Sequence, residues 1–237
     1  MSETLTIDTP DGAFSAYVAR PSAEPAPAPA PAPAIVVIQE IFGVNKVMRD
    51  VCDNLAAQGF MAICPDLFWR IEPGIDITDQ SEAEWKRAFE LYNAFDVEAG
   101  VSDIAATIAA ARALPAVNGK VGALGYCLGG LLAFLTAART DSDVTVAYYG
   151  VGIEKHVGEA DKLARPLLMH IAEEDQFVPK EAQKVILGAL KDHLQIEVQT
   201  YPGCDHAFAR VGGEHYDASA AGRANARTLS FFKSKLG

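Results

Sequence analysis

The stretch Gly125-Tyr126-Cys127-Leu128-Gly129-Gly130 decides the fold of this chain. An apolar run (KVGAL) precedes it and a Leu- and Ala-rich run (LLAFLTAAR) follows it, which is the pattern of a strand, a sharp turn and a helix. The central residue of such a turn takes a strained backbone conformation. Neighbouring backbone passes so close to the turn that the residues two before and two after must be small. Gly125 and Gly129 meet that requirement.

The same turn indicates a chemical role for Cys127. It would present the side chain at the top of a sheet and at a helix N-terminus, whose partial positive charge favours a thiolate. The amide of Leu128 would then be free to stabilise an oxyanion. Gly-x-Cys-x-Gly also occurs in Gly-rich turns that hold a buried thiol, but the flanking strand and helix favour a nucleophile. We therefore predict that Cys127 is the nucleophile of an enzyme.

Strand and helix patterns alternate along the chain. Such alternation predicts a mostly parallel central sheet with helices on both faces, and ligands of such sheets bind at the carboxyl ends of the strands. Two short strands joined at Pro10-Asp11-Gly12 come first. The later predicted strands are Ile35–Gln39, Phe60–Cys64, Gly119–Leu124, Val144–Tyr149, Leu167–Ile171 and Gln195–Tyr201. The predicted helices are 44–55, Ser81–Asn93, Glu98–Leu114, Cys127–Arg139, Lys180–Leu190 and Asp217–Lys235.

Composition excludes several classes of protein. The 20 Lys and Arg against 31 Asp and Glu give a formal net charge of −11, which argues against a nucleic-acid partner. The four cysteines have no zinc-site spacing, so we expect no metal, no cofactor and a reduced compartment. No apolar run reaches the ~18 residues of a membrane span, and the N-terminus has no signal-peptide pattern. We expect a cytoplasmic protein that binds no membrane.

We expect a single domain over 1–237. The Pro-Ala alternation at 25–34 is predicted to be an extended, solvated surface loop within that domain, because proline fixes φ and supplies no amide donor.

A cysteine nucleophile needs a base, and three histidines that follow Cys127 are candidates. His170 lies inside the apolar run LLMHI, which indicates a core residue. His193 lies in the polar stretch KDHLQ, which indicates a solvated one. His206 follows the strand IEVQTYPG, at a strand's carboxyl end. We predict that His206 is the base.

The base needs an acid to orient it. Asp175 follows the strand LLMHI in the loop AEEDQFVP, where Glu173 and Glu174 are immediate rivals. Val178-Pro179 resembles the turn that usually follows the acid of an α/β-hydrolase. The chain order Cys127, Asp175, His206 is also the nucleophile, acid, histidine order of that fold. We therefore predict an α/β-hydrolase fold with Asp175 as the acid.

Several motifs in one order resemble the dienelactone hydrolase family, also called carboxymethylenebutenolidase. The resemblance covers nearly the whole chain. It implies hydrolysis of a carboxylate-bearing unsaturated lactone (dienelactone to maleylacetate type) through a thioester, as in bacterial breakdown of chloroaromatic compounds. It also implies a monomer without a cofactor. The motifs are QEIFGVN (39–45), CPDL (64–67), AFD (94–96), GYCLGG (125–130), YYG (148–150) and HAFAR (206–210).

The resemblance also implies roles for residues outside the triad. The glutamate that matches Glu40 contacts the resting, neutral thiol, and bound substrate shifts it so that the thiolate forms. The amide of Ile41 joins that of Leu128 in the oxyanion hole. Arg210 binds the substrate carboxylate, with a solvated surface cation as the alternative on sequence alone.

Two positions depart from the family pattern. Trp85 stands where a second arginine is expected, and Ala207 stands where serine is common. Lys86 and Arg87 adjoin Trp85, but neighbours on a helix point about 100° apart, so neither is an automatic replacement. Both departures affect substrate binding rather than the triad. The aromatic residues predicted to line the pocket, unless they belong to the core, are Phe42, Trp85, Tyr92 and Tyr149.

Three other functions stay open. A broader carboxylesterase or thioesterase would use the same triad on a different acyl group, and the missing arginine favours it. A non-catalytic ligand receptor could share the fold, although an intact triad argues against it. A thiol redox sensor could use Cys127, with Cys204 as the nearest candidate for a resolving cysteine.

Overall fold

The computed structural model describes residues 2–21 and 31–237 of the chain. The chain forms two compact units, Met1–Ala123 and Leu124–Gly237. Each unit is an arrangement of strands and helices.

The first unit carries an antiparallel hairpin and a parallel strand pair. Strands β1 and β2 pair from Ser2↔Ala19 to Thr9↔Gly12, which confirms the predicted turn at Pro10-Asp11-Gly12. Strand β2 is antiparallel to β4, and β4 is parallel to β3. The elements of this unit are β1 (Ser2–Thr9), β2 (Gly12–Ala19), β3 (Ala32–Ile38), α1 (Lys46–Ala57), β4 (Met61–Pro65), α2 (Glu82–Ala94), α3 (Val97–Ala113) and most of β5 (Val117–Tyr126).

The end of the Pro-Ala run is strand, not loop. Strand β3 begins at Ala32, whose amide donates to the carbonyl of Ala116 at 2.9 Å, and Ala34 is fully buried. The prediction of a surface loop through Ala34 is therefore wrong for residues 32–34. The reason is that extended proline backbone resembles that of a strand, and Pro33 near the strand's beginning is tolerated despite its missing amide. Residues 25–30 of the predicted loop lie outside the described residues.

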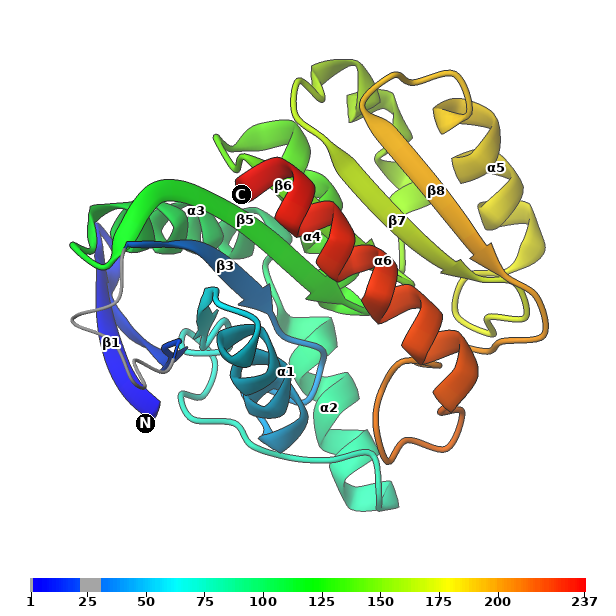
Figure 1. Cartoon of the computed structure of the whole chain (residues 1–237). Helices are drawn as coiled ribbons and strands as arrows, with labels where there is room; N and C mark the ends of the chain where they lie inside the picture. The colour runs from blue at the N-terminus through cyan, green and yellow to red at the C-terminus, as the bar shows by residue number, and fades with distance from the viewer. Residues whose placement is uncertain (1, 22–30) are drawn as a thin grey trace. The chain divides into compact units, whose positions relative to one another are not determined.

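The second unit contains three parallel strands. Its elements are the end of β5, α4 (Leu128–Arg139), β6 (Val144–Tyr148), two short 3-10 helices η1 (Ile153–Lys155) and η2 (Val157–Lys162), β7 (Leu167–Ala172), α5 (Lys180–Leu190), β8 (Ile196–Tyr201) and α6 (Ala218–Leu236). Strand β7 lies between β6 and β8 and pairs in parallel with both. In Figure 1, α6 crosses one face of these strands and α4 lies on the other. Parallel strands with helices on both faces confirm the predicted α/β class.

Helix starts follow sequence signals. An Asn, Ser or Asp side chain accepts a hydrogen bond from the first turn of each of four helices, which satisfies amides that the helix itself cannot. These caps are Asn45 for α1, Ser81 for α2, Asp96 for α3 and Asp217 for α6. Helix α4 differs, because Cys127 occupies its cap position and forms no side-chain cap hydrogen bond.

Candidate active site

The turn at Cys127 has the strain that the sequence predicts. Cys127 has φ 56° and ψ −115° between the end of β5 and the start of α4, although it is neither Gly nor Asn. Its amide donates to the carbonyl of Tyr148 at 3.1 Å, so the end of β6 holds the turn in place. The cysteine is 7% exposed. A non-glycine residue persists in this conformation only where its surroundings determine it, which is typical of catalytic turns.

Glycines make the close approach possible. A Cβ on Gly125 would lie 1.9 Å from the carbonyl oxygen of Gly129, so no other residue fits there. A Cβ on Gly130 would lie 2.4 Å from the carbonyl oxygen of Tyr148, and one on Gly150 would lie 2.6 Å from the carbonyl carbon of Gly130. The prediction for Gly125 is confirmed. The local sequence does not reveal the contact between Gly130 and Gly150, because the two glycines belong to different parts of the chain.

Asp175 and His206 meet as predicted. Asp175 Oδ2 lies 2.8 Å from His206 Nδ1, and the two side chains are 1% and 4% exposed. Asp175 Oδ1 accepts the amides of Phe177 and Val178, which fixes the carboxylate in a tight turn. The rival Glu174 is exposed and pairs with Lys180 instead. The loop after β7 therefore offers Asp175, not its neighbours, to the histidine.

Aromatic rings and charges surround the imidazole of His206. The Tyr149 ring packs edge-on at 5.0 Å and the Phe177 ring at 4.9 Å between centroids. Burial lowers the pKa of His206, but negative charge on Cys127 and the hydrogen bond with Asp175 outweigh it and raise that pKa to about 10. His206 Nε2 has no hydrogen bond of good geometry within the described residues, although it lies close enough to Cys127 for the sulfur's charge to act on it. The raised pKa favours a protonated imidazole beside Asp175.

The other histidines lie where their sequence context predicts or nearly so. His170 is buried in β7 between Tyr201 and Thr228, to which its two ring nitrogens are hydrogen-bonded. His193 is half-buried rather than fully solvated, because its Nδ1 accepts the amide of Gln195 in the turn before β8. Neither contacts Asp175 in the interactions described.

Two predicted binding residues of the second unit are buried. Arg210 is 6% exposed, so it is not a solvated surface cation. Tyr149 has φ 37° and ends the predicted strand one residue early, at Tyr148. Its ring packs against both His206 and Phe208. Both positions suit a substrate-contacting role, which stays a prediction.

Within the first unit, Glu40, Ile41 and Phe42 follow β3 and are 2%, 5% and 1% exposed. Phe42 packs edge-on against Trp85, whose indole nitrogen donates to the carbonyl of Asp79. Phe42 and Trp85 therefore contact each other. The predicted roles of Glu40, Ile41 and the half-buried Tyr92 stay predictions.

The structure also describes the two cations beside Trp85. Arg87 is bound to Glu72 and, at 3.1 Å, to Glu90, so its charge is already used within the first unit. Lys86 is exposed. Arg87 is therefore a poor replacement for the expected arginine.

The sequence did not predict two residues that contact the site from neighbouring loops. Phe177 and Asp205 lie beside predicted site residues, but nothing in their local pattern distinguishes them from ordinary loop residues. Ala207 has φ 62°, a left-handed conformation directly after His206 that its sequence does not signal. Among the described residues, no group of three or more His, Cys, Asp or Glu side chains could hold a metal ion. No described helix has the length and apolar character needed to cross a membrane.

Comparison with known proteins identifies the family. A model described as the dienelactone hydrolase family matches residues 14–236. The chain belongs to the dienelactone hydrolase family. Its members are hydrolases, and the predicted class of ester-bond hydrolase is confirmed by this match and by the relatives below.

Named relatives match this chain over almost its whole length. A carboxymethylenebutenolidase of Pseudomonas putida is 44% identical over 98% of this chain and 96% of its own. A protein of Azospirillum brasilense with a provisional carboxymethylenebutenolidase name is 54% identical over 96% of each chain. A solved structure from Klebsiella pneumoniae, provisionally named a dienelactone hydrolase, superposes with a TM-score of 0.84 at 26% identity over 98% of each chain. These matches confirm the α/β-hydrolase fold.

Proposed function

We propose that this protein hydrolyses a carboxylate-bearing unsaturated lactone through a Cys127–His206–Asp175 triad and a thioester intermediate. The 2.8 Å contact between Asp175 Oδ2 and His206 Nδ1, beside a cysteine held at the start of α4, carries the proposal. The relatives named carboxymethylenebutenolidase support a lactone as the substrate class.

Acylation begins with the thiolate of Cys127. Its sulfur attacks the lactone carbonyl carbon, and the carbonyl oxygen becomes an oxyanion. The amide of Leu128 stands at the first helical position of α4, where the helix supplies no acceptor, so it is available to that oxyanion. As the intermediate collapses, the ring C–O bond breaks. The leaving enolate oxygen takes a proton from the His206 imidazolium, which leaves a thioester and a neutral imidazole.

Deacylation restores the starting state. The neutral imidazole takes a proton from water as the water oxygen attacks the thioester carbonyl. The C–S bond then breaks, the carboxylate product leaves, and Cys127 returns as a thiolate beside the imidazolium. Asp175 holds the Nδ1–H of His206 throughout, which fixes the tautomer and stabilises the positive charge of the ring. One proton of the water regenerates the His206 imidazolium, and the other passes to solvent as the new carboxyl group ionises. The proton that His206 gave up during acylation leaves on the enol oxygen of the product.

A second candidate is a broader esterase on the same triad. Trp85 in place of an arginine, together with the engagement of Arg87 by Glu72 and Glu90, favours it. Such an enzyme would lack one of the two cations expected to select a carboxylate, and would hydrolyse neutral esters with comparable efficiency.

The deciding assay follows loss of the ultraviolet absorbance of a dienelactone, beside hydrolysis of p-nitrophenyl acetate. We expect rapid loss of the lactone that Cys127→Ala abolishes, because Cys127 is the thiol next to His206. Cys204→Ala is the matched control, since Cys204 is also a buried free cysteine, at 5% exposure. Turnover of p-nitrophenyl acetate alone would support the broader esterase. Turnover that survives Cys127→Ala would contradict the triad.

A further inference from the structure

Asp205, the residue directly before His206, bridges the two loops that supply the acid and the base. Its Oδ1 accepts the backbone amide of His206 at 2.6 Å and the backbone amide of Gln176 at 3.0 Å. Gln176 directly follows Asp175 in the loop after β7, whereas His206 lies in the loop after β8. A single carboxylate oxygen therefore ties together the peptides beside both partners of the Asp175–His206 pair.

These two contacts constrain the geometry of that pair from both sides. Asp175 uses Oδ1 for the amides of Phe177 and Val178, which leaves Oδ2 for His206 Nδ1. The position of Oδ2 depends on the peptide after Asp175, which Asp205 holds. The position of the imidazole depends on the peptide of His206, which Asp205 also holds.

The loop around His206 needs such support. Ala207 takes a left-handed φ of 62°, which is unfavourable for an alanine and persists only where neighbouring contacts determine it. A charged acceptor forms stronger hydrogen bonds to amides than a neutral one does. The second oxygen of Asp205 lies 3.7 Å from His215 Nε2.

We propose that Asp205 is a positioning residue for the reaction: its Oδ1 holds the Gln176 and His206 peptides so that Asp175 meets His206 Nδ1. This inference rests on the proposed triad. Asp205 does not touch the reacting atoms, and its effect passes through Asp175 and His206.

The test compares three substitutions of one residue. Asp205→Asn keeps an oxygen acceptor at the same length, and we expect kcat to stay within about threefold of the wild type. Asp205→Ala removes the acceptor, and we expect kcat to fall about 10- to 100-fold with KM little changed, because misplacement of catalytic groups by about 1 Å has that effect. Asp205→Glu keeps the charge but displaces the oxygen, so we expect a similar loss. This third variant also covers the case in which Asp205→Ala does not fold.

A readout that needs no substrate separates this inference from the proposed function. The hydrogen-bonded Nδ1 proton of His206 should give a low-field proton resonance that His206→Asn removes. We expect the resonance to persist in Asp205→Asn and to broaden or vanish in Asp205→Ala. Glu214→Gln, at an exposed position in the following loop, is the control for general charge effects. Wild-type kcat and resonance in Asp205→Ala, or equal losses in the Asn and Ala variants, would overturn the proposal.

Discussion

Cys127 shows how a single residue can combine backbone strain with chemistry. Its left-handed φ of 56° places the thiol at the start of α4, where the helix dipole favours negative charge. Strain of this kind costs roughly 1–3 kcal/mol and is maintained by tight contacts elsewhere. Here those contacts are the close approaches at Gly125 and Gly130. Negative charge on Cys127 in turn raises the pKa of His206.

Substitution of the acid should separate Asp175 from its neighbours. Asp175→Asn keeps the size of the side chain but removes its charge, so it no longer stabilises the imidazolium or fixes the tautomer of His206. We expect kcat to fall by about 10²- to 10⁴-fold. Glu174→Gln, one residue earlier and exposed, should retain wild-type kcat and is the matched control. Equal activity of the two variants in the lactone assay would remove Asp175 from the proposed triad.

Residues of the site differ in how far their local sequence reveals them. Asp175 could be chosen over Glu173 and Glu174 because Val178-Pro179 marks the turn that follows it. The role of Asp205 could not be predicted, because its contact with Gln176 joins two loops and the two residues are 29 positions apart in the chain. The burial of Arg210 was equally hidden, since a cation in a loop is ordinarily solvated.

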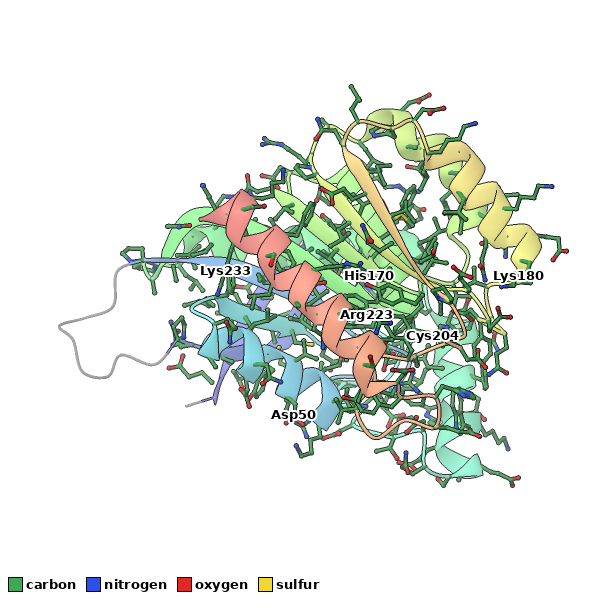
Figure 2. The ribbon with its side chains drawn as sticks, turned by 45° about the vertical axis from the view of Figure 1, so that its right-hand side comes forward. Asp50, His170, Lys180, Cys204, Arg223 and Lys233 are labelled. Carbon is green, nitrogen blue, oxygen red and sulfur yellow. The ribbon has the colours of Figure 1, made fainter. Side chains whose placement is uncertain are left out.

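At the scale of elements, a chain of hydrogen bonds attaches α6 to the three parallel strands of the second unit. Figure 2 shows His170 on the sheet beside α6, with Arg223 of that helix near Cys204. Each link is a side-chain contact of 2.7 to 3.1 Å. In order, the chain runs Arg227, Tyr201, His170, Thr228, Tyr148 and Asn225.

Arg227 can only donate, so the hydroxyl of Tyr201 accepts from it. The ring nitrogens of His170 lie 2.8 Å from the Tyr201 hydroxyl and 2.9 Å from the Thr228 hydroxyl, and each hydroxyl can donate or accept. The neutral ring is therefore hydrogen-bonded at both nitrogens. Burial, assisted by the charge of Arg227, lowers the pKa of His170 to about 3.

This neutral histidine predicts a loss of stability in mild acid. In the unfolded chain a histidine titrates near pH 6.5, whereas folded His170 stays neutral down to about 3, so below about 6.5 the unfolded state binds one proton more. The contribution of neutral His170 to the free energy of unfolding is fully present above pH 6.5. It falls as the pH drops below that value, by up to about 1.4 kcal/mol per pH unit. The free energy of unfolding from urea titrations should differ between about pH 7.5 and about pH 5 by about 2 kcal/mol more in the wild type than in His170→Gln, which cannot titrate.

The control for this measurement is His193→Gln, at a half-buried position outside the hydrogen-bond chain. We expect it to keep the acid sensitivity of the wild type. An unchanged difference between the two pH values in His170→Gln would show that other groups cause the acid response.

Most elements were predicted from the sequence, and the errors have local causes. Buried β-branched runs and side-chain caps locate strands and helices because each signal lies within a few residues of the element it marks. The start of β3 was missed because prolines conceal a strand, and its pairing with Ala116 is a distant contact. Strand β5 begins at Val117, two residues before the predicted start at Gly119. The prediction began too late because a glycine in the sequence usually indicates a break, whereas here the strand continues through it.

For the whole molecule, the family and fold follow from motifs spread over the length of the chain, but substrate preference does not. Preference depends on which cations face the substrate, and Trp85 stands where the resemblance leads us to expect an arginine. Arg87 is paired with Glu72 and Glu90, and Arg210 is buried. A carboxylate substrate would approach a protein whose net charge is strongly negative.

The net charge of −11 should repel an anionic substrate, and this repulsion can be measured. The field of an acidic protein slows the approach of an anion, and salt screens that field, since the Debye length falls from about 10 Å at 0.1 M to about 3 Å at 1 M. A buried cation such as Arg210 is screened much less than exposed charges are. We therefore expect kcat/KM for the anionic lactone to rise about two- to fivefold between about 0.1 M and about 1 M sodium chloride. The value for p-nitrophenyl acetate, which is neutral, should stay flat and is the control. A fall in kcat/KM for the lactone would mean that exposed positive charge near the site, rather than the field of the whole molecule, governs the encounter.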